Sequence, residues 1–113
     1  MHELSLAVNA VEICLEESKG QRISKVVIEK GVFSGVDGHA FEFAWPEATK
    51  GTDLSESAME LVERDGLLRC KSCQHSFASK ELITLCPKCE NFNFEIIEGR
   101  EFRVLSLEVE HVS

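Results

Sequence analysis

Residues 70–94 read CKSCQHSFASKELITLCPKCENFNF, and this stretch sets the organisation of the chain. Cys70 and Cys73 form one C-x2-C pair, and Cys86 and Cys89 form a second pair after twelve intervening residues. The two-residue gap lets both thiolates of a pair face one ion, and a short hairpin or loop brings the pairs together. The spacing therefore predicts a tetrahedral, structural zinc site with four cysteine ligands and no open position for catalysis.

Two other uses of paired cysteines, a redox dithiol and an iron–sulfur centre, fit this stretch less well. A thioredoxin-type C-x-x-C is expected once, at the start of a helix that lowers its thiol pKa. Here two pairs occur in a stretch with little helical periodicity. Because the stretch has almost no core of its own, zinc should supply most of its folding free energy, on the order of 10 kcal/mol. Its small apolar packing is expected from Phe77, Leu82, Leu85 and Phe92.

The cysteine segment also differs in charge from the sequence on either side of it. The chain has 113 residues, of which 43% are hydrophobic, 12 are basic and 20 are acidic, for a net charge of −8. Residues 66–100 carry a net charge of +1, and the remainder carries −9. We therefore predict an α/β platform made of residues 1–65 and 101–113, with a zinc-ribbon domain of residues 66–100 inserted between its last two strands.

The platform sequence alternates between helical and strand patterns. Residues 4–18 and 37–50 carry apolar side chains at three- and four-residue steps, which predicts two helices. Val8 belongs to the apolar stripe of the first helix, and Pro46 should kink or split the second because it lacks a backbone N–H. Strands are predicted over residues 23–32, 57–65 and 102–110, with Leu105, Leu107 and Val109 on one face of the last.

The composition argues against several classes of function. A net charge of −8 is unlike a nucleic-acid binder, which would normally show a basic face. The sequence has no apolar run near the roughly 20 residues that span a membrane, and no signal-peptide pattern at its start. We therefore expect a cytoplasmic protein, in which paired cysteines are more often metal ligands than disulfides. A Gly-rich phosphate loop, a nucleophile elbow and an H-E-x-x-H metal motif are also absent from the sequence.

The amino-terminal Met1-His2-Glu3 forms a second candidate metal site. An X-His terminus offers the α-amine of Met1, the amide nitrogen of His2 once deprotonated, and the His2 imidazole in fused chelate rings. Nitrogen-rich, square-planar sites favour Ni(II) or Cu(II). Since the α-amine has a pKa of about 7.7–8.0, metal loading should strengthen as pH rises through neutrality. Taken alone, however, a histidine at position 2 more often has no metal role.

Three separated features together resemble one family. They are the start MHELSLA over residues 1–7, the stretch GVFSGVDGHAFEFA over residues 31–44, and the two cysteine pairs returning through GREFRVLSLEVE over residues 99–110. In combination they resemble the HypA/HybF family of nickel metallochaperones, over essentially the whole chain. Gly31-Val32-Phe33, where the family usually has a Gly-acid-Leu pattern, and Pro46 depart from it.

The resemblance implies an α+β fold, with two helices on a three-stranded mixed sheet and an inserted zinc ribbon. It implies that Ni(II) binds at the terminus through the His2 side chain and the backbone nitrogens of His2 and Glu3, with Glu3 helping by carboxylate contacts. Asp37, which follows the SGV stretch, is expected near the nickel site. Zinc falls to Cys70, Cys73, Cys86 and Cys89.

The function implied by the resemblance is nickel binding and delivery during maturation of [NiFe]-hydrogenase, with no enzymatic activity. The implied partners are a nickel-handling GTPase, the hydrogenase large subunit and, for some members, urease maturation proteins; no nucleic acid and no membrane are expected. The alternative is a zinc-ribbon adaptor that binds a protein partner without nickel. A thiol oxidoreductase and a metal-dependent hydrolase are more distant alternatives, since zinc-bound thiolates do not cycle freely and His2 has no companion ligands at helical spacing.

Overall fold

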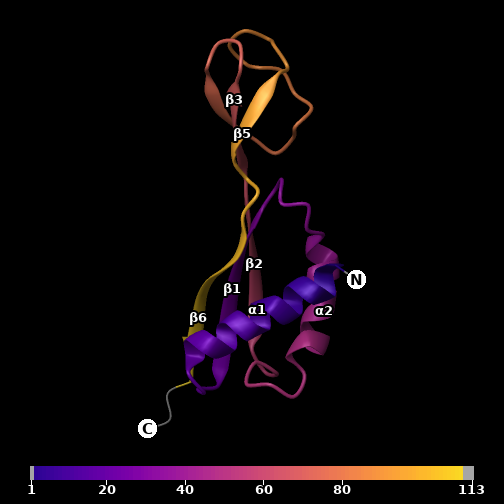
Figure 1. Cartoon of the computed structure of the whole chain (residues 1–113), viewed down its shortest axis with the longest axis vertical. Helices are drawn as coiled ribbons and strands as arrows, with labels where there is room; N and C mark the ends of the chain where they lie inside the picture. Colours follow the sequence, from indigo (N-terminus) through magenta and orange to yellow (C-terminus); the bar gives the residue numbers. More distant parts are fainter. Residues whose placement is uncertain (1, 111–113) are drawn as a thin grey trace. The chain divides into compact units, whose positions relative to one another are not determined.

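A computed structural model describes residues 2–110, which form two helices and two three-stranded sheets (Figure 1). The elements in chain order are α1 (His2–Ser18), β1 (Ile23–Gly31), α2 (Gly38–Thr49), β2 (Ala58–Arg64), β3 (Gly66–Cys70), β4 (Ser76–Ser79), β5 (Phe94–Glu98) and β6 (Phe102–Val109). One sheet has the order β2-β1-β6 and the other β4-β3-β5. This is the predicted α+β fold, with the second sheet formed by the cysteine segment. Neither helix of the described chain is long and apolar enough to cross a membrane.

The chain divides into two compact units, each built from separate stretches of sequence. Unit 1 comprises residues 2–29, 36–62 and 102–110 of the described chain, and unit 2 comprises residues 30–35 and 63–101. The four cysteines of the predicted zinc site all belong to unit 2. That the units act as a nickel-binding platform and a zinc ribbon, with functional boundaries at residues 65 and 101, stays a prediction.

The sheet of unit 1 is mixed because β1 pairs differently on its two sides. The Glu110 N–H donates to the Arg22 carbonyl at 2.8 Å, so β6 begins where β1 ends and runs antiparallel to it. On the other side, the Ile23 N–H donates to the Asp53 carbonyl at 3.0 Å. This hydrogen bond joins the start of β1 to the segment that leads into β2, so the two strands run parallel. The parallel pair needs a crossover, which α2 supplies.

Both helices bury apolar side chains against this sheet, and α1 crosses in front of it in Figure 1. The Phe41 ring centroid lies 5.8 Å from that of Trp45 and 5.0 Å from that of Phe102, the latter edge to face. Cys14 is fully buried, which raises the pKa of its thiol to about 11. The buried core consists of Ala7, Ala10, Val11, Cys14, Ile23, Val26, Ile28, Val36, Phe41, Ala44, Trp45 and Leu54.

Three details of the predicted platform are wrong. Val8 of the predicted stripe is exposed, and Ala10 is buried instead. Pro46 does not split α2, which runs unbroken through it; the kink that is the other predicted outcome stays a prediction. Leu105 is also exposed.

The error at Leu105 has a specific cause in β6. Phe102 and Val104 pack against the core, as do Leu107 and Val109, whereas Leu105 and Ser106 are both exposed. The inward face therefore changes from even to odd residues within the strand. Strict alternation, which the prediction assumed, cannot represent such a change of phase.

In unit 2, β3 is the central strand, paired antiparallel with β4 and β5. Leu68 on β3 is fully buried and lies opposite Phe77 of β4 and Ile96 of β5. The Phe77 and Phe94 rings meet edge to face, with their centroids 5.3 Å apart. These strand residues make the apolar packing of the unit, so the prediction is right for Phe77.

The same prediction is wrong for Leu82, Leu85 and Phe92, which are exposed. They lie in the irregular segments between β4 and β5, where no strand partner covers them. Proximity to the cysteines in sequence does not bury a side chain in a module this small.

Phe33, which belongs to unit 2, packs its ring against two glycines, Gly66 and Gly99. Its N–H donates to the Gly99 carbonyl at 2.7 Å, and the preceding Val32 N–H donates to the Arg64 carbonyl at 2.9 Å. A Cβ atom on Gly66 would overlap the Phe33 ring, and one on Gly99 would lie 2.8 Å from it. Gly99 also has a φ of +124°, a region that side chains rarely adopt. The Phe33 ring therefore occupies the space that the two glycines leave.

We predict that Gly66→Ala destabilises unit 2 by about 1–3 kcal/mol, because the added methyl group cannot enter the space held by the Phe33 ring. In a Phe33→Ala background the same change should cost far less, since the ring is gone. Native-state hydrogen exchange of the β3 amides in the zinc-loaded protein measures both costs. An equal cost in the two backgrounds would show that the ring is not the obstacle.

Candidate metal centres

The two cysteine pairs of unit 2 have the same backbone geometry. In the first pair, the Gln74 N–H donates to the Cys70 carbonyl at 2.9 Å; in the second, the Glu90 N–H donates to the Cys86 carbonyl at 2.8 Å. Gln74 and Glu90 have φ values of +65° and +62°, which turn the chain sharply after the second cysteine of each pair. Each pair is therefore a closed turn that presents two sulfur atoms on one side.

The four sulfur atoms of Cys70, Cys73, Cys86 and Cys89 all lie within 4.8 Å of one another. The Sγ atoms of Cys70 and Cys89 are 3.5 Å apart, and those of Cys73 and Cys86 are 3.7 Å apart. A tetrahedron of sulfurs around zinc, with Zn–S bonds of about 2.3 Å, has edges of about 3.8 Å. The cluster therefore fits a structural tetrathiolate zinc site, as the spacing predicts.

Backbone N–H groups aimed at the sulfurs lower their thiol pKa values, whereas desolvation and, at Cys89, the neighbouring sulfurs raise them. The Cys73 N–H lowers the pKa of the Cys70 thiol to about 7. At Cys86, desolvation raises the pKa, but the Cys89 N–H and its neighbour outweigh it and lower the pKa overall. The Asn91 N–H lowers the pKa of Cys89, but desolvation and the three nearby sulfurs raise it to about 12. Some of the thiols are thus ready to ionise, while all four together require a cation.

A side-chain hydrogen bond that the sequence did not suggest also joins the two turns. The Asn91 Nδ2 atom donates to the Ser72 hydroxyl at 2.7 Å, across from one cysteine pair to the other. The backbone adds a link on the same side, where the Lys71 N–H donates to the Asn93 carbonyl at 2.9 Å. A serine and an asparagine beside cysteines are common loop residues, so no sequence signal distinguishes this contact.

The second predicted site lies at the start of α1 in unit 1. His2 is the first residue of the helix, and its side chain is 68% exposed, whereas that of Glu3 is 20% exposed. The His2 Nδ1 atom is 3.6 Å from the Glu3 Oε2 atom. Met1, whose α-amine was expected to bind nickel, lies outside the described residues.

Glu3 also contacts the residue that the family resemblance places near nickel. The Asp37 N–H donates to the Glu3 Oε2 atom at 3.3 Å, and this bond is the main reason that the pKa of the Glu3 carboxyl is lowered. The Asp37 carboxylate itself accepts from the N–H groups of His39 and Ala40 at 3.0 and 3.2 Å. Asp37 is thus the N-cap of α2, and its backbone rather than its carboxylate faces Glu3.

The side chains at this terminus do not make a metal site by themselves. Among residues 2–110, the four cysteines are the one group of three or more His, Cys, Asp or Glu side chains close enough to hold an ion. The backbone has further nitrogen atoms here, because the N–H groups of the first helical turn have no acceptor within the helix. The N–H groups of His2 and Glu3 therefore make no helical hydrogen bond, and the Glu3 N–H donates to its own carboxylate.

We predict that chelation of zinc releases four reactive thiols and leaves the fifth protected. The cysteines of the cluster lose their cation, whereas Cys14 stays buried with its thiol protonated at neutral pH. Thiol titration with a chromogenic disulfide, before chelation, after chelation and after denaturation, counts each class while zinc is measured in parallel. A fifth thiol that reacts together with the other four would mean that loss of zinc also unfolds unit 1.

We predict that Asp37→Ala lowers the stability of unit 1 by about 1 kcal/mol, because α2 loses its N-cap. Asp37→Asn keeps a capping oxygen and the backbone N–H that faces Glu3, so it should be nearly neutral for stability. The thermal melting of the two variants, followed by Trp45 fluorescence, distinguishes them. Equal losses in both variants would contradict the capping role.

Comparison with known proteins identifies the family of the chain. The profile of the HypA family, described as "Hydrogenase/urease nickel incorporation, metallochaperone, hypA", matches residues 1–109. The chain is 40% identical over 111 residues to "Hydrogenase maturation factor HypA" of Geotalea uraniireducens (strain Rf4), covering 97% of this chain and 100% of that protein. The equivalent protein of Geobacter sulfurreducens is also 40% identical over 111 residues, with the same coverage.

A solved structure shares the fold. The "Solution structure of the Ni metallochaperone HypA from Helicobacter pylori" superposes with a TM-score of 0.68 and 28% sequence identity, covering 95% of this chain and 96% of that one. The family profile, the relatives and the solved structure all extend over nearly the whole chain. The protein therefore belongs to the HypA family of hydrogenase and urease nickel-incorporation metallochaperones.

Proposed function

We propose that this protein binds Ni(II) at the amino-terminal end of α1 and delivers it during maturation of [NiFe]-hydrogenase. The observation that carries the proposal is the coincidence, at one helix end, of an exposed imidazole and two backbone amides without helical acceptors. With the α-amine of Met1, these groups supply the nitrogen-rich donor set that Ni(II) prefers. Four cysteines hold zinc elsewhere in the chain, so the two metals need not compete for ligands.

The orientation of His2 supports chelation. Nδ1 is the ring nitrogen that can close a small chelate ring with the amide nitrogen of its own residue. In the structure this atom points to the Glu3 carboxylate, 3.6 Å away. Nickel bound to Nδ1 would therefore have a carboxylate beside it, which favours the divalent cation.

Glu3 also offsets an unfavourable feature of the location. The amino-terminal end of a helix carries a partial positive charge, which repels cations. Glu3 in the first turn of α1 places a negative charge there, and the Asp37 N–H holds the carboxylate in place. We propose that Glu3 acts by its charge and by positioning His2, in addition to its backbone nitrogen.

The wider role follows from the family. We propose that the protein passes nickel to a hydrogenase large subunit together with a nickel-handling GTPase, that urease maturation is a further destination for this class of protein, and that it is not an enzyme. The five cysteines are all unpaired in the structure, which suits the reducing cytoplasm where we propose it acts. A zinc-ribbon adaptor that ignores nickel is the alternative, favoured by the closed zinc site of unit 2.

A calorimetric titration of the untagged, zinc-loaded protein with Ni(II) tests the proposal. We expect one-to-one binding that strengthens as pH rises from 6.5 to 8, since the α-amine titrates in this range with a pKa of about 7.7–8.0. His2→Ala and a Gly-Ser extension before Met1 should each abolish tight binding. Glu3→Gln should weaken it about tenfold or less, because the backbone nitrogen remains.

The matched controls are Asp37→Asn and His39→Ala. Asp37 contacts Glu3 through its backbone N–H, and its carboxylate faces its own helix. His39 is an exposed histidine in the first turn of α2. The nickel affinity should therefore be unchanged in both variants. Zinc content must stay constant throughout. Tight binding that survives the Gly-Ser extension would place nickel elsewhere and favour the adaptor.

A further inference from the structure

The four cysteines of the zinc site in unit 2 differ in their exposure to solvent. Cys70 and Cys86 are buried, Cys73 is partly buried and Cys89 is exposed. A closed site of four thiolates loses its zinc ligand by ligand, because a chelator reaches the ion only where a sulfur gives way. Cys89 is the ligand that solvent reaches most easily. The retention of zinc therefore depends most on what holds Cys89 in place.

The two cysteine pairs are held by different parts of unit 2. Cys70 is the last residue of β3, the central strand, and its N–H donates to the His75 carbonyl at 2.9 Å. The second pair, Cys86 and Cys89, lies between β4 and β5 in a segment that contains no strand. The first pair is thus anchored in the sheet, whereas the second pair needs contacts of another kind.

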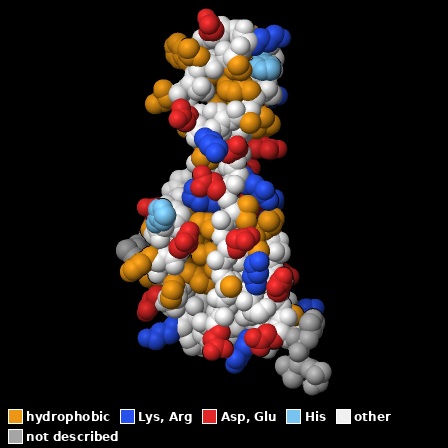
Figure 2. Space-filling view, turned by 180° about the vertical axis from the view of Figure 1, so that it is seen from behind, with side chains coloured by type: hydrophobic (Ala, Val, Ile, Leu, Met, Phe, Trp, Pro, Cys, Tyr) orange, Lys and Arg blue, Asp and Glu red, His pale blue; other side chains and the backbone are white. Residues whose placement is uncertain are grey.

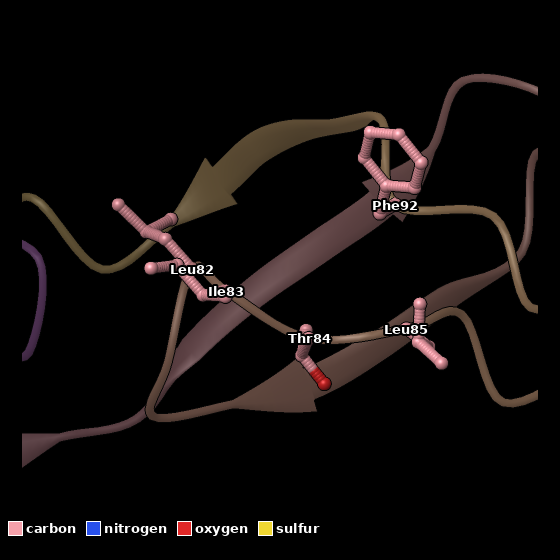
Figure 3. A pocket seen from close by; sticks show the side chains of 5 residues that line it. All are labelled: Leu82, Ile83, Thr84, Leu85 and Phe92. Carbon is pink, nitrogen blue, oxygen red and sulfur yellow. The ribbon is translucent and has the colours of Figure 1, made fainter.

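Apolar packing does not supply these contacts. Leu85, which precedes Cys86, is 58% exposed, and Phe92 is 76% exposed. Both line a pocket of about 450 Å³ at the surface of unit 2, whose other lining residues are Leu82, Ile83 and Thr84 (Figure 3). Figure 2 likewise shows hydrophobic side chains at the surface of this unit. Because these side chains face solvent, they cannot fix the second cysteine pair.

Hydrogen bonds of Asn91 hold the second pair instead. Its carbonyl accepts from the Cys86 N–H at 2.8 Å, and its own N–H is hydrogen-bonded to the Cys89 sulfur. Its side-chain oxygen accepts from the Phe92 N–H at 3.0 Å, and its side-chain nitrogen donates to the Ser72 hydroxyl at 2.7 Å. Asn91 thus binds both cysteines of its own pair and reaches across to the other pair.

Ser72 has the matching place in the first pair. Its N–H is hydrogen-bonded to the Cys70 sulfur, as the Asn91 N–H is to the Cys89 sulfur. These two sulfurs, one from each pair, lie 3.5 Å apart. The hydrogen bond between the Ser72 and Asn91 side chains therefore joins the two residues whose backbone N–H groups contact these sulfurs.

We propose that the Ser72–Asn91 hydrogen bond controls the rate at which zinc leaves the protein, by keeping the exposed Cys89 sulfur beside that of Cys70. Neither side chain is a zinc ligand, so Ser72 and Asn91 are positioning residues. Loss of such an outer group typically lowers metal affinity about 10–100-fold. Because this bond is exposed to water, we expect an effect near the lower end of that range. The inference concerns zinc alone and does not depend on nickel binding at the amino terminus.

Transfer of zinc from the full-length, zinc-loaded protein to an excess of pyridylazoresorcinol, followed by absorbance, tests the proposal. Ser72→Ala and Asn91→Ala should each accelerate zinc release about tenfold. The double variant should release zinc within about twofold of the rate for Asn91→Ala, since the same bond is lost. Ser72→Thr keeps a hydroxyl group at this position and should release zinc as slowly as the unaltered protein.

Ser79→Ala is the matched control. The Ser79 hydroxyl donates to the Glu81 carbonyl at 2.7 Å and accepts from the Glu81 N–H at 3.1 Å, within one stretch of unit 2 and not between the cysteine pairs. Its removal should leave the rate of zinc release unchanged. An acceleration of less than about threefold in Ser72→Ala, or an equal acceleration in Ser79→Ala, would overturn the proposal.

The order of thiol modification separates positioning from a general loss of structure. With limiting N-ethylmaleimide and the labelled cysteines located by mass spectrometry, Ser72→Ala should accelerate labelling of Cys89 about tenfold. Labelling of Cys73, the partly buried ligand of the first pair, should stay unchanged over the same early interval. Equal acceleration at Cys73 and Cys89 would contradict the proposal, because it would show that unit 2 loosens as a whole.

Discussion

Four thiolate sulfurs can lie within 4.8 Å of one another only with a cation among them, and the fold of unit 2 depends on this constraint. Backbone N–H groups favour ionisation at Cys70, but the pKa of about 12 at Cys89 shows how strongly the last proton is held when the other sulfurs are near. Zinc offsets the repulsion among the four thiolates and binds the two cysteine turns to one ion. The small sheet of β3, β4 and β5, with Leu68 as its buried residue, is then enough to complete the unit.

The parts of the fold that were predictable are those set by local spacing. A C-x2-C pair places two sulfurs on one turn wherever it occurs. The helical spacing of the apolar residues from Phe41 to Trp45 places them on one face of α2, and that face is the buried one. The errors arise where the exposure of a side chain depends on the course of its strand or on whether another element covers it. Leu105 is exposed because β6 changes phase, and Leu82, Leu85 and Phe92 are exposed because no element covers their loops. Gln74 and Glu90 adopt positive φ without being glycines, so nothing in their identity indicates the turn.

The candidate nickel site was predictable in its residues but not in its setting. His2 and Glu3 follow from the order of the first residues and from the family resemblance. That α1 begins at His2, so that the first-turn amides are free of helical acceptors, requires the structure. The role of Asp37 likewise depends on which of its groups faces Glu3. An acid at that position suggested a carboxylate near the metal, whereas the structure shows a cap on α2 and a backbone N–H toward Glu3.

The contact of Phe33 with Gly66 and Gly99 bears on how such a protein could be rebuilt. Unit 2 is not one continuous piece of chain, since residues 30–35 belong to it together with residues 63–101. A gene fragment encoding the cysteine stretch alone would leave two adjoining glycines without the ring that covers them. The zinc-bearing part is therefore not a cassette, and exchanging it between relatives would require the short segment after β1 to be exchanged as well.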